Sequence, residues 1–157
     1  MSRETLDTST AGAAAYDVND NDDPQQRETE AIIARLGMRA HVEGGYYAIA
    51  DDGAAAPGAD ADRAPYSVIY FLLTRQQKSH WHKLDAAEVW FWHSDSVHVL
   101  GSDLAADQRP QAIVPKDAWQ TARPLGGWAL VSCMMAPQFA WSGFSLAPPG
   151  WAPGAPS

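Results

Sequence analysis

A predicted β-hairpin in the middle of the chain constrains the fold more than any other feature. Residues 79–92 read Ser-His-Trp-His-Lys-Leu-Asp-Ala-Ala-Glu-Val-Trp-Phe-Trp, so two histidines stand one residue apart and a carboxylate follows a short polar segment. Side chains alternate between the two faces of a strand, and we therefore expect His80 and His82 to point the same way. If residues 84–87 form the turn, Glu88 begins the return strand and faces that side too. Two imidazoles and a carboxylate inside a barrel suit metal binding or acid–base chemistry.

Short apolar and β-branched segments continue along most of the chain, with Gly, Pro, Asp and Ser at the breaks between them. These segments predict strands at residues 66–73, 88–92, 97–100, 111–114, 118–122, 128–135 and 139–146. Many short strands separated by turns predict an all-β sandwich or barrel.

One helix is predicted ahead of the strands. Asp23 is a suitable N-cap, Pro24 follows at the first helical position, and Gly37 is a natural residue at which to end the helix. The apolar residues at positions 32, 33 and 36 form one stripe, which we expect to pack against the barrel wall.

Composition narrows the class of protein. A chain of 157 residues with 46% hydrophobic residues predicts one domain, which we place at 23–151, after a disordered leader at 1–22 and before a flexible tail at 152–157. A net charge of −8 argues against nucleic acid and anionic membranes as partners. With no apolar run of bilayer length and no secretory signal, we expect a cytoplasmic protein. The single cysteine, Cys133, excludes an intramolecular disulfide and is expected to be a small buried hydrophobe.

An ordered series of motifs resembles the cupin superfamily, and within it the group known as DUF985 or cupin 5. The general cupin features are the paired histidines, the later glutamate, and Pro115-x-Asp117-x-x-Gln120. The DUF985 features begin near residue 29 and include Glu43-Gly44-Gly45-Tyr46-Tyr47, Ile69-Tyr70-Phe71-Leu72-Leu73, Ser79, Trp81-His82, Glu88-Val89-Trp90, Val114-Pro115, Trp119-Gln120-Thr121-Ala122-Arg123-Pro124-Leu125-Gly126 and Phe144-x-Leu146-Ala147-Pro148-Pro149-Gly150-Trp151. This resemblance implies a double-stranded β-helix, the cupin jelly-roll barrel, in a group without an agreed activity.

The chain departs from the family pattern in three places. Gln120 stands where cupins generally carry a metal-binding histidine, although His80 completes a His-x-His motif that most DUF985 members lack. Residues 92–99 run almost directly into Leu100-Gly101, so a hairpin is shortened, and we expect a homodimer to cover the strand edge this exposes. Ala48-Ile49 replaces a family Arg-Glu pair, which removes polar groups from the expected pocket.

His82 and Glu88 are the predicted catalytic pair, and the alternative is a buried pair that only stabilises the barrel. The predicted ligand-binding residues are Glu43, Tyr47, Tyr70, Trp90 and Gln120. The alternative for the aromatic residues is core packing, and for Glu43 it is a solvated surface acid. A divalent transition metal, if one is used, would be held by His80, His82, Glu88 and Gln120. The other histidines, His41, His93 and His98, are expected at the surface or at strand edges.

Three functions stay open at this point. The first is binding of a small carbohydrate-like or other polar ligand, with metal-independent isomerase or epimerase chemistry by His82 and Glu88. The second is a metal-dependent oxygenase or isomerase. The third is a binding module without catalysis, in which a ligand stabilises the fold but is not turned over.

Overall fold

A computed structural model of the chain describes residues 23–54, 63–94 and 100–154. The helix α1 (Pro24–Leu36) begins and ends where the sequence predicts. The Asp23 side chain accepts a hydrogen bond from the backbone N–H of Gln25, and Gly37 closes the helix in the left-handed conformation at φ 61°.

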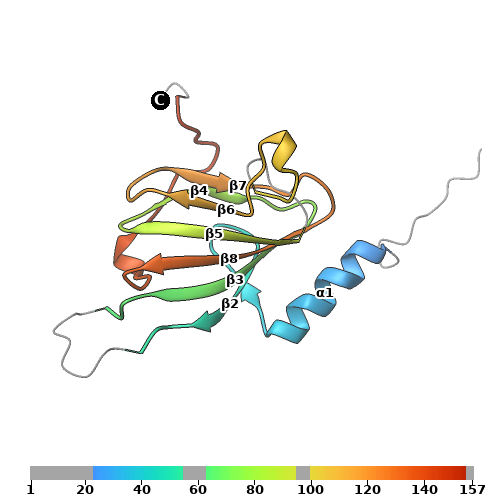
Figure 1. Cartoon of the computed structure of the whole chain (residues 1–157), viewed down its shortest axis with the longest axis horizontal. Coiled ribbons are helices and arrows are strands. Elements are labelled where there is room, and N and C mark those ends of the chain that lie inside the picture. Colours follow the sequence, from blue (N-terminus) through green and yellow to red (C-terminus); the bar gives the residue numbers. More distant parts are fainter. Residues whose placement is uncertain (1–22, 55–62, 95–99, 155–157) are drawn as a thin grey trace, which may run out of the picture.

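The packing of α1 is looser than its apolar stripe predicts. Ile32, Ile33 and Leu36 are only half-buried, and Thr29 is the buried residue of the helix. Figure 1 shows α1 projecting to one side of the strands instead of lying across a sheet face. A stripe of three large apolar residues gives the helix little surface to bury, so its contact with the barrel is small.

Two antiparallel sheets form the body of the protein, as the cupin resemblance implies. The larger sheet has the order β1 (Arg39–Ala40), β2 (Tyr46–Asp51), β3 (Ser67–Leu73), β8 (Ala129–Ala136), β5 (Ala87–Ser94) and β6 (Gln111–Val114). The smaller sheet has the order β7 (Gln120–Ala122), β4 (Ser79–Leu84) and β9 (Phe144–Leu146). β4 lies in the small sheet and β5 in the large one, so the two strands do not pair with each other and the predicted hairpin is wrong. The connection between them instead places the two halves of the central motif in different sheets.

The predicted strands are confirmed in most places and wrong in one. Residues 139–146 were expected to form a strand throughout, but η3 (Trp141–Gly143) is a 3₁₀ helix and only the last three residues pair, as β9. Another short 3₁₀ helix is η2 (Leu104–Ala106). The predicted strand at 97–100 falls mostly outside the described residues, and Leu100 forms an isolated bridge with Arg109.

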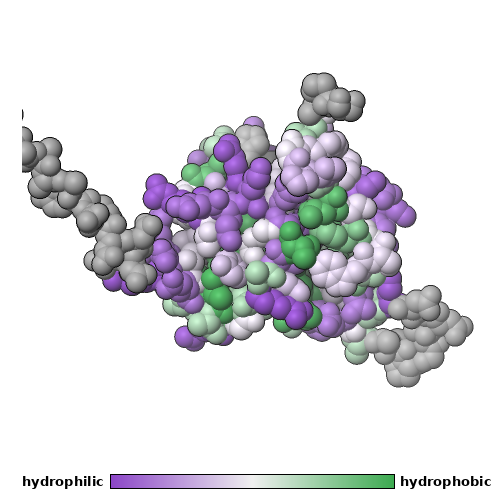
Figure 2. Space-filling view, turned by 180° about the vertical axis from the view of Figure 1, so that it is seen from behind, coloured by the Kyte–Doolittle hydropathy of each residue, from purple (hydrophilic) through white to green (hydrophobic). Residues whose placement is uncertain are grey.

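The hydrophobic core lies between the sheets and is built mainly on β3, β5 and β8. Phe71, Trp90, Val131 and Cys133 are all buried there, which confirms the expectation for the cysteine. The surface is mostly polar, with apolar side chains gathered near the middle of the face shown in Figure 2. Among the described residues, no helix is long and apolar enough to cross a bilayer.

Candidate functional site

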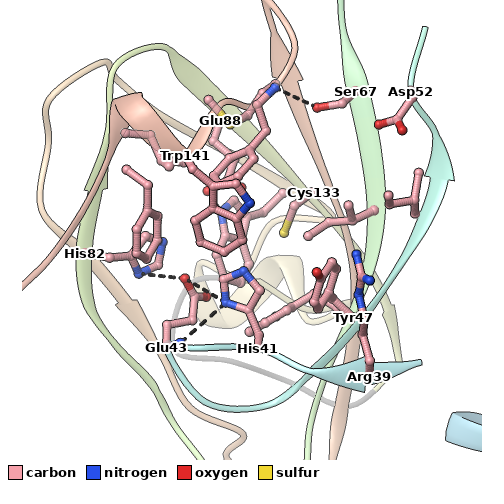
Figure 3. A pocket seen from close by; sticks show the side chains of 18 residues that line it. Arg39, His41, Glu43, Tyr47, Asp52, Ser67, His82, Glu88, Cys133 and Trp141 are labelled. Atoms are coloured by element: carbon pink, nitrogen blue, oxygen red, sulfur yellow. Dashed lines mark hydrogen bonds and ion pairs between the residues drawn. The ribbon is translucent and has the colours of Figure 1, made fainter.

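A cavity of about 140 Å³ opens between the two sheets. Its lining is largely apolar, and its polar groups include carboxyls, imidazoles, hydroxyls and one guanidinium (Figure 3). The predicted residues that line it are Glu43, Tyr47, His82, Glu88 and Trp90. Its remaining lining residues are Arg39, His41, Ile49, Asp52, Ser67, Ile69, Phe71, Leu84, Cys133, Met135, Phe139, Trp141 and Phe144. A large apolar wall with a few convergent polar groups is the usual composition of a small-ligand site.

The inward face of β4 is set by an irregularity in its pairing with β7. Ser79 pairs with Ala122 and His82 with Gln120, so the two residues between them on β4 oppose a single residue of β7. The extra residue breaks the simple alternation of the strand. Ser79 and His82 therefore both point inward, with Ser79 Oγ 3.4 Å from His82 Nδ1. The expectation that His80 and His82 share a face is wrong for this reason.

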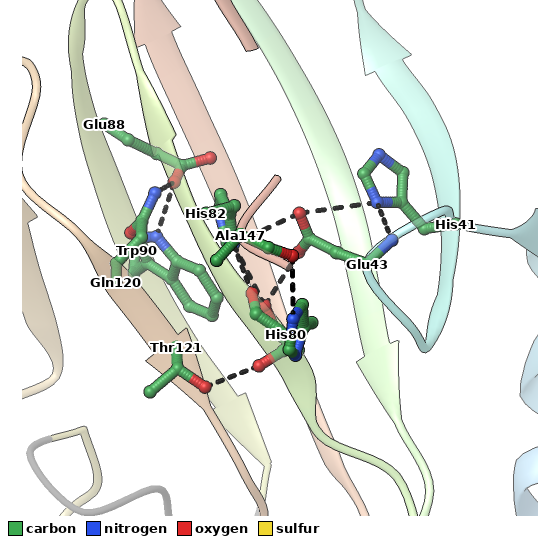
Figure 4. Close-up of polar contacts among 10 residues, drawn as sticks. His41, Glu43, His80, His82, Glu88, Trp90, Gln120, Thr121 and Ala147 are labelled. Atoms are coloured by element: carbon green, nitrogen blue, oxygen red, sulfur yellow. Dashed lines mark hydrogen bonds and ion pairs between the residues drawn. The ribbon is translucent and has the colours of Figure 1, made fainter. Parts of the chain in front are cut away.

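His80 is directed away from the cavity. Its Nε2 atom lies 3.0 Å from the carbonyl oxygen of Ala147 and 3.1 Å from that of Pro148, so it donates to the segment after β9 (Figure 4). The set His80, His82 and Glu88 proposed for a metal does not converge. Within the described ranges, no group of three or more His, Cys, Asp or Glu side chains is arranged to hold a metal ion.

The buried Glu43 is positioned by the two glycines that follow it. Gly44 and Gly45 have φ values of 101° and 78°, a region that favours glycine. A Cβ atom would lie 2.5 Å from the Lys78 carbonyl oxygen at position 44, and 2.7 Å from the Leu72 carbonyl oxygen at position 45. The glycine pair thus lets the turn press against neighbouring backbone, and Glu43 enters the cavity wall at 7% exposure instead of lying in solvent.

A polar network joins Glu43 to two imidazoles (Figure 4). Ser79 Oγ donates to Glu43 Oε1 at 2.9 Å, while Glu43 Oε2 lies 3.4 Å from Nδ1 of both His41 and His82. Burial and, to a smaller extent, the nearby Glu88 carboxyl together raise the pKa of Glu43 to about 8, against the opposing effect of the Ser79 hydrogen bond. The His41 Nδ1 atom accepts the backbone N–H of Glu43, so this nitrogen carries no proton.

His82 is held as a single neutral tautomer. Its Nδ1 atom lies 2.9 Å from the carbonyl oxygen of His80, which can only accept, so the proton of the ring is on Nδ1. Burial lowers the pKa of His82, although this backbone hydrogen bond works in the other direction. The ring stacks on Phe144 with centroids 5.7 Å apart. Its other nitrogen, Nε2, keeps a lone pair and is available as a base.

Glu88 is held by two donors on the same oxygen. Trp90 Nε1 donates to Glu88 Oε2 at 2.8 Å, and Gln120 Nε2 donates to that atom at 2.6 Å. Burial raises the pKa of Glu88, and these two hydrogen bonds oppose the shift. Gln120 does not line the cavity, and its Oε1 atom is buried without a partner in the described structure. Gln120 therefore acts on the site through Glu88.

Tyr70 and His41 do not lie where the sequence predicts them. Tyr70 is on the face of β3 opposite to Ile69 and Phe71, which line the cavity, and its ring lies near His93 outside it. His41 was expected at the surface, but its side chain is 9% exposed and its ring stacks on Trp141 at 5.8 Å. Burial and the nearby His82 and Arg39 lower the pKa of His41 to about 4.

His93 is exposed, as expected, and its Nε2 lies 2.6 Å from Ser132 Oγ. His98 lies outside the described residues. Trp141 and Arg39 were not singled out from the sequence. Ser79 is among the residues that carry the family resemblance, although no role in the site was predicted for it.

The chain belongs to DUF985, a family of the cupin superfamily. The profile of this family matches residues 30–147. The protein SO0799 from Shewanella oneidensis has a similar crystal structure, with 35% sequence identity, a TM-score of 0.67, and coverage of 75% of this chain and 83% of that one. A hypothetical protein from Leishmania major is similar at 26% identity and a TM-score of 0.65, covering 74% of this chain and 85% of that one. A search of curated proteins found no match. The predicted family and jelly-roll fold are thus confirmed.

Proposed function

We propose that the cavity binds a small carbonyl compound, such as an open-chain sugar or a related polar molecule, and moves a proton on it without a metal. His82 removes a proton from the carbon next to the carbonyl group, and Glu88 donates a proton to the carbonyl oxygen. The observation that carries the proposal is that one cavity holds an imidazole with a free lone pair and a buried carboxyl whose pKa is raised.

The base is argued from the fixed tautomer of His82. Because Nδ1–H donates to the His80 carbonyl oxygen, ring flipping would break a 2.9 Å hydrogen bond inside a buried site. Since burial favours the neutral ring, Nε2 is unprotonated at neutral pH. A fixed, neutral imidazole is the form that a general base requires before the reaction starts.

The acid is argued from the asymmetry of Glu88. Oε2 accepts two N–H donors, so a proton on this carboxyl resides on Oε1. Figure 4 shows Oε1 turned away from Trp90 and Gln120. A buried carboxylic acid with one fixed oxygen and one proton-bearing oxygen is suited to donate to a carbonyl group.

The step is balanced without an oxidant or reductant. The C–H electron pair forms a carbon–carbon double bond, the carbonyl π pair moves to oxygen, and oxygen takes the proton of Glu88. When His82 returns a proton to the same carbon, the enol O–H gives its proton back to Glu88, and addition to the opposite face gives an epimer. When the proton goes instead to the former carbonyl carbon of an enediol, the neighbouring O–H gives its proton to Glu88 and the product is an isomer. Cavities near 150 Å³ accept benzene-sized molecules, so this one encloses the reacting end of a ligand and leaves the rest at the mouth.

Hydrogen–deuterium exchange followed by NMR in D₂O tests the proposal directly. Wild-type protein should speed exchange at the carbon next to the carbonyl in a panel of short aldoses, ketoses and oxo acids. His82→Gln and Glu88→Gln should each slow it by roughly 100-fold or more, since each removes one proton-transfer group. Glu88→Gln keeps an acceptor for Trp90 and Gln120, so the fold is preserved. Exchange that survives both substitutions would contradict the assignment.

Binding without turnover is the alternative outcome of the same experiment. Ligand-induced stabilisation with no exchange in the wild type would identify a binding module.

A further inference from the structure

We infer that the ligand carries a carboxylate, bound at the mouth of the cavity by Arg39, while its carbonyl end reaches His82 and Glu88. This inference rests on the proposed proton transfer for the role of the inner end. It makes the substrate class a small oxo acid and gives Arg39 the role of selecting it. Four observations lead to this assignment.

The first is the position of Arg39. It lies on β1, paired with Tyr47 of β2, and its guanidinium is 4.7 Å from the centre of the Tyr47 ring. Both residues line the cavity, and Figure 3 shows the guanidinium at the edge of the site beside that ring. The contact with the ring face limits the directions in which the side chain points.

The second is that this cation has no counter-ion in the described structure. No carboxylate of the described residues lies within ion-pair distance of Arg39, and it is the only Lys or Arg among the residues that line the cavity. Its charge reaches the site, because it is among the causes that lower the pKa of His41. A planar guanidinium with open donors matches the two oxygens of a carboxylate.

The third is the contrast between mouth and interior. The exposed lining residues are Arg39, Ile49, Asp52 and Trp141, whereas the buried walls carry the carboxyls of Glu43 and Glu88. An anion placed deep in the cavity would lose its water against walls that hold no Lys or Arg. The charged end of a ligand is therefore favoured at the mouth, and an uncharged carbonyl end is favoured inside.

The fourth observation separates a carboxylate from a phosphate. Arg39 acts alone, without a second Lys or Arg among the lining residues, and Asp52 shares the mouth. A dianion would be opposed by Asp52 and only half neutralised by one guanidinium. A monoanion is matched in charge by Arg39 and fits the bidentate geometry of one side chain.

Binding is measured separately from turnover, by quenching of the fluorescence of Trp90 and Trp141, which line the cavity. The probes are pyruvate, acetoacetate and laevulinate, each beside its methyl ester, with inorganic phosphate as a further anion. Wild-type protein should bind the acids more tightly than the esters. Arg39→Gln should weaken binding of the acids by roughly 10- to 100-fold, the value of a charged hydrogen-bonded contact, and leave the esters unchanged. Arg39→Lys should retain part of the preference.

Arg123→Gln is the matched control, because it removes one positive charge at an exposed position that does not line the cavity. It should behave as the wild type. The inference is overturned if the acids bind no better than their esters, if Arg39→Gln weakens both equally, or if phosphate competes as well as the acids do. Acid binding through Arg39 without deuterium exchange would uphold the inference and refute the proposed proton transfer. Exchange of esters and acids alike, independent of Arg39, would do the reverse.

Discussion

The substitution Glu43→Gln should change how the stability of the protein depends on pH. Burial raises the pKa of Glu43 from 4.5 to about 8, so the folded protein holds this proton more tightly than the unfolded chain does. A raised pKa gives stability that is complete below pH 4.5 and is lost as pH rises through 8. His41 acts in the opposite sense, because its pKa is lowered from 6.5 to about 4 and its stability is lost as pH falls.

Between pH 4.5 and 6.5, the contributions of Glu43 and His41 to the free energy of unfolding change in opposite directions and cancel in part. Above pH 6.5, the contribution of Glu43 predominates. One titrating group changes the free energy of unfolding by about 1.4 kcal/mol for each pH unit. From pH 6.5 to 8, His41 is neutral in the folded protein and at most half protonated in the unfolded chain, so Glu43 dominates and should lower the free energy of unfolding by about 2 kcal/mol. Glu88 has a raised pKa as well and adds to this decline.

Urea denaturation at a series of pH values measures this decline. Glu43→Gln keeps an oxygen that accepts the hydrogen bond from Ser79, so the variant should fold. Between pH 6.5 and 8 its free energy of unfolding should fall by about 2 kcal/mol less than that of the wild type. Glu30→Gln, at an exposed position of α1, is the control and should follow the wild type. Equal slopes for Glu43→Gln and the wild type over this range would refute the reasoning.

Three further substitutions test the fold and the assembly. In urea denaturation, Gly45→Ala should lower the free energy of unfolding by at least about 2 kcal/mol more than Gly150→Ala does. Both glycines have φ 78°, but only a Cβ atom at position 45 would meet neighbouring atoms. Equal losses in the two variants would contradict this close approach. His80→Ala should leave the metal content of the purified protein unchanged by elemental analysis, and loss of about one equivalent of metal would restore His80 as a ligand. Ile113→Lys should dissociate the predicted homodimer, as measured by sedimentation. Ile113 is 66% exposed on β6, the edge strand of the larger sheet. A wild type that sediments as a monomer would contradict the prediction.

The parts of the fold that the sequence predicts are those with local causes. The ends of α1 follow from a cap and a left-handed glycine. The break between β4 and β5 falls at Asp85 and Ala86, within the turn expected at residues 84–87. The strand β8 follows from a continuous apolar run that is buried on the larger sheet. The loose packing of α1 was not predictable, because a stripe shows which face is apolar and says nothing of how much surface is opposite it.

The candidate site was predictable where a backbone constraint has a visible residue type. Glu43 is such a case, since the two adjacent glycines after it indicate a turn. This turn packs closely against neighbouring backbone and places the Glu43 side chain inside. His41 was assigned to the surface because its burial depends on Trp141, which is one hundred residues later in the chain and approaches only in the fold. Tyr70 was assigned to the cavity because its strand was recognised but not which face of that strand points inward.

The placement of His80 shows why spacing alone misassigns a site. An alternating strand would put His80 and His82 together, and the motif would then resemble a metal site. One extra residue between Ser79 and His82 exchanges His80 for Ser79 at the inner face. A hydroxyl that donates to Glu43 takes the place of a second imidazole, and the outer histidine instead holds the segment after β9. The arrangement therefore differs from the metal-binding set that alternation would give, and the cause is one irregularity in strand pairing.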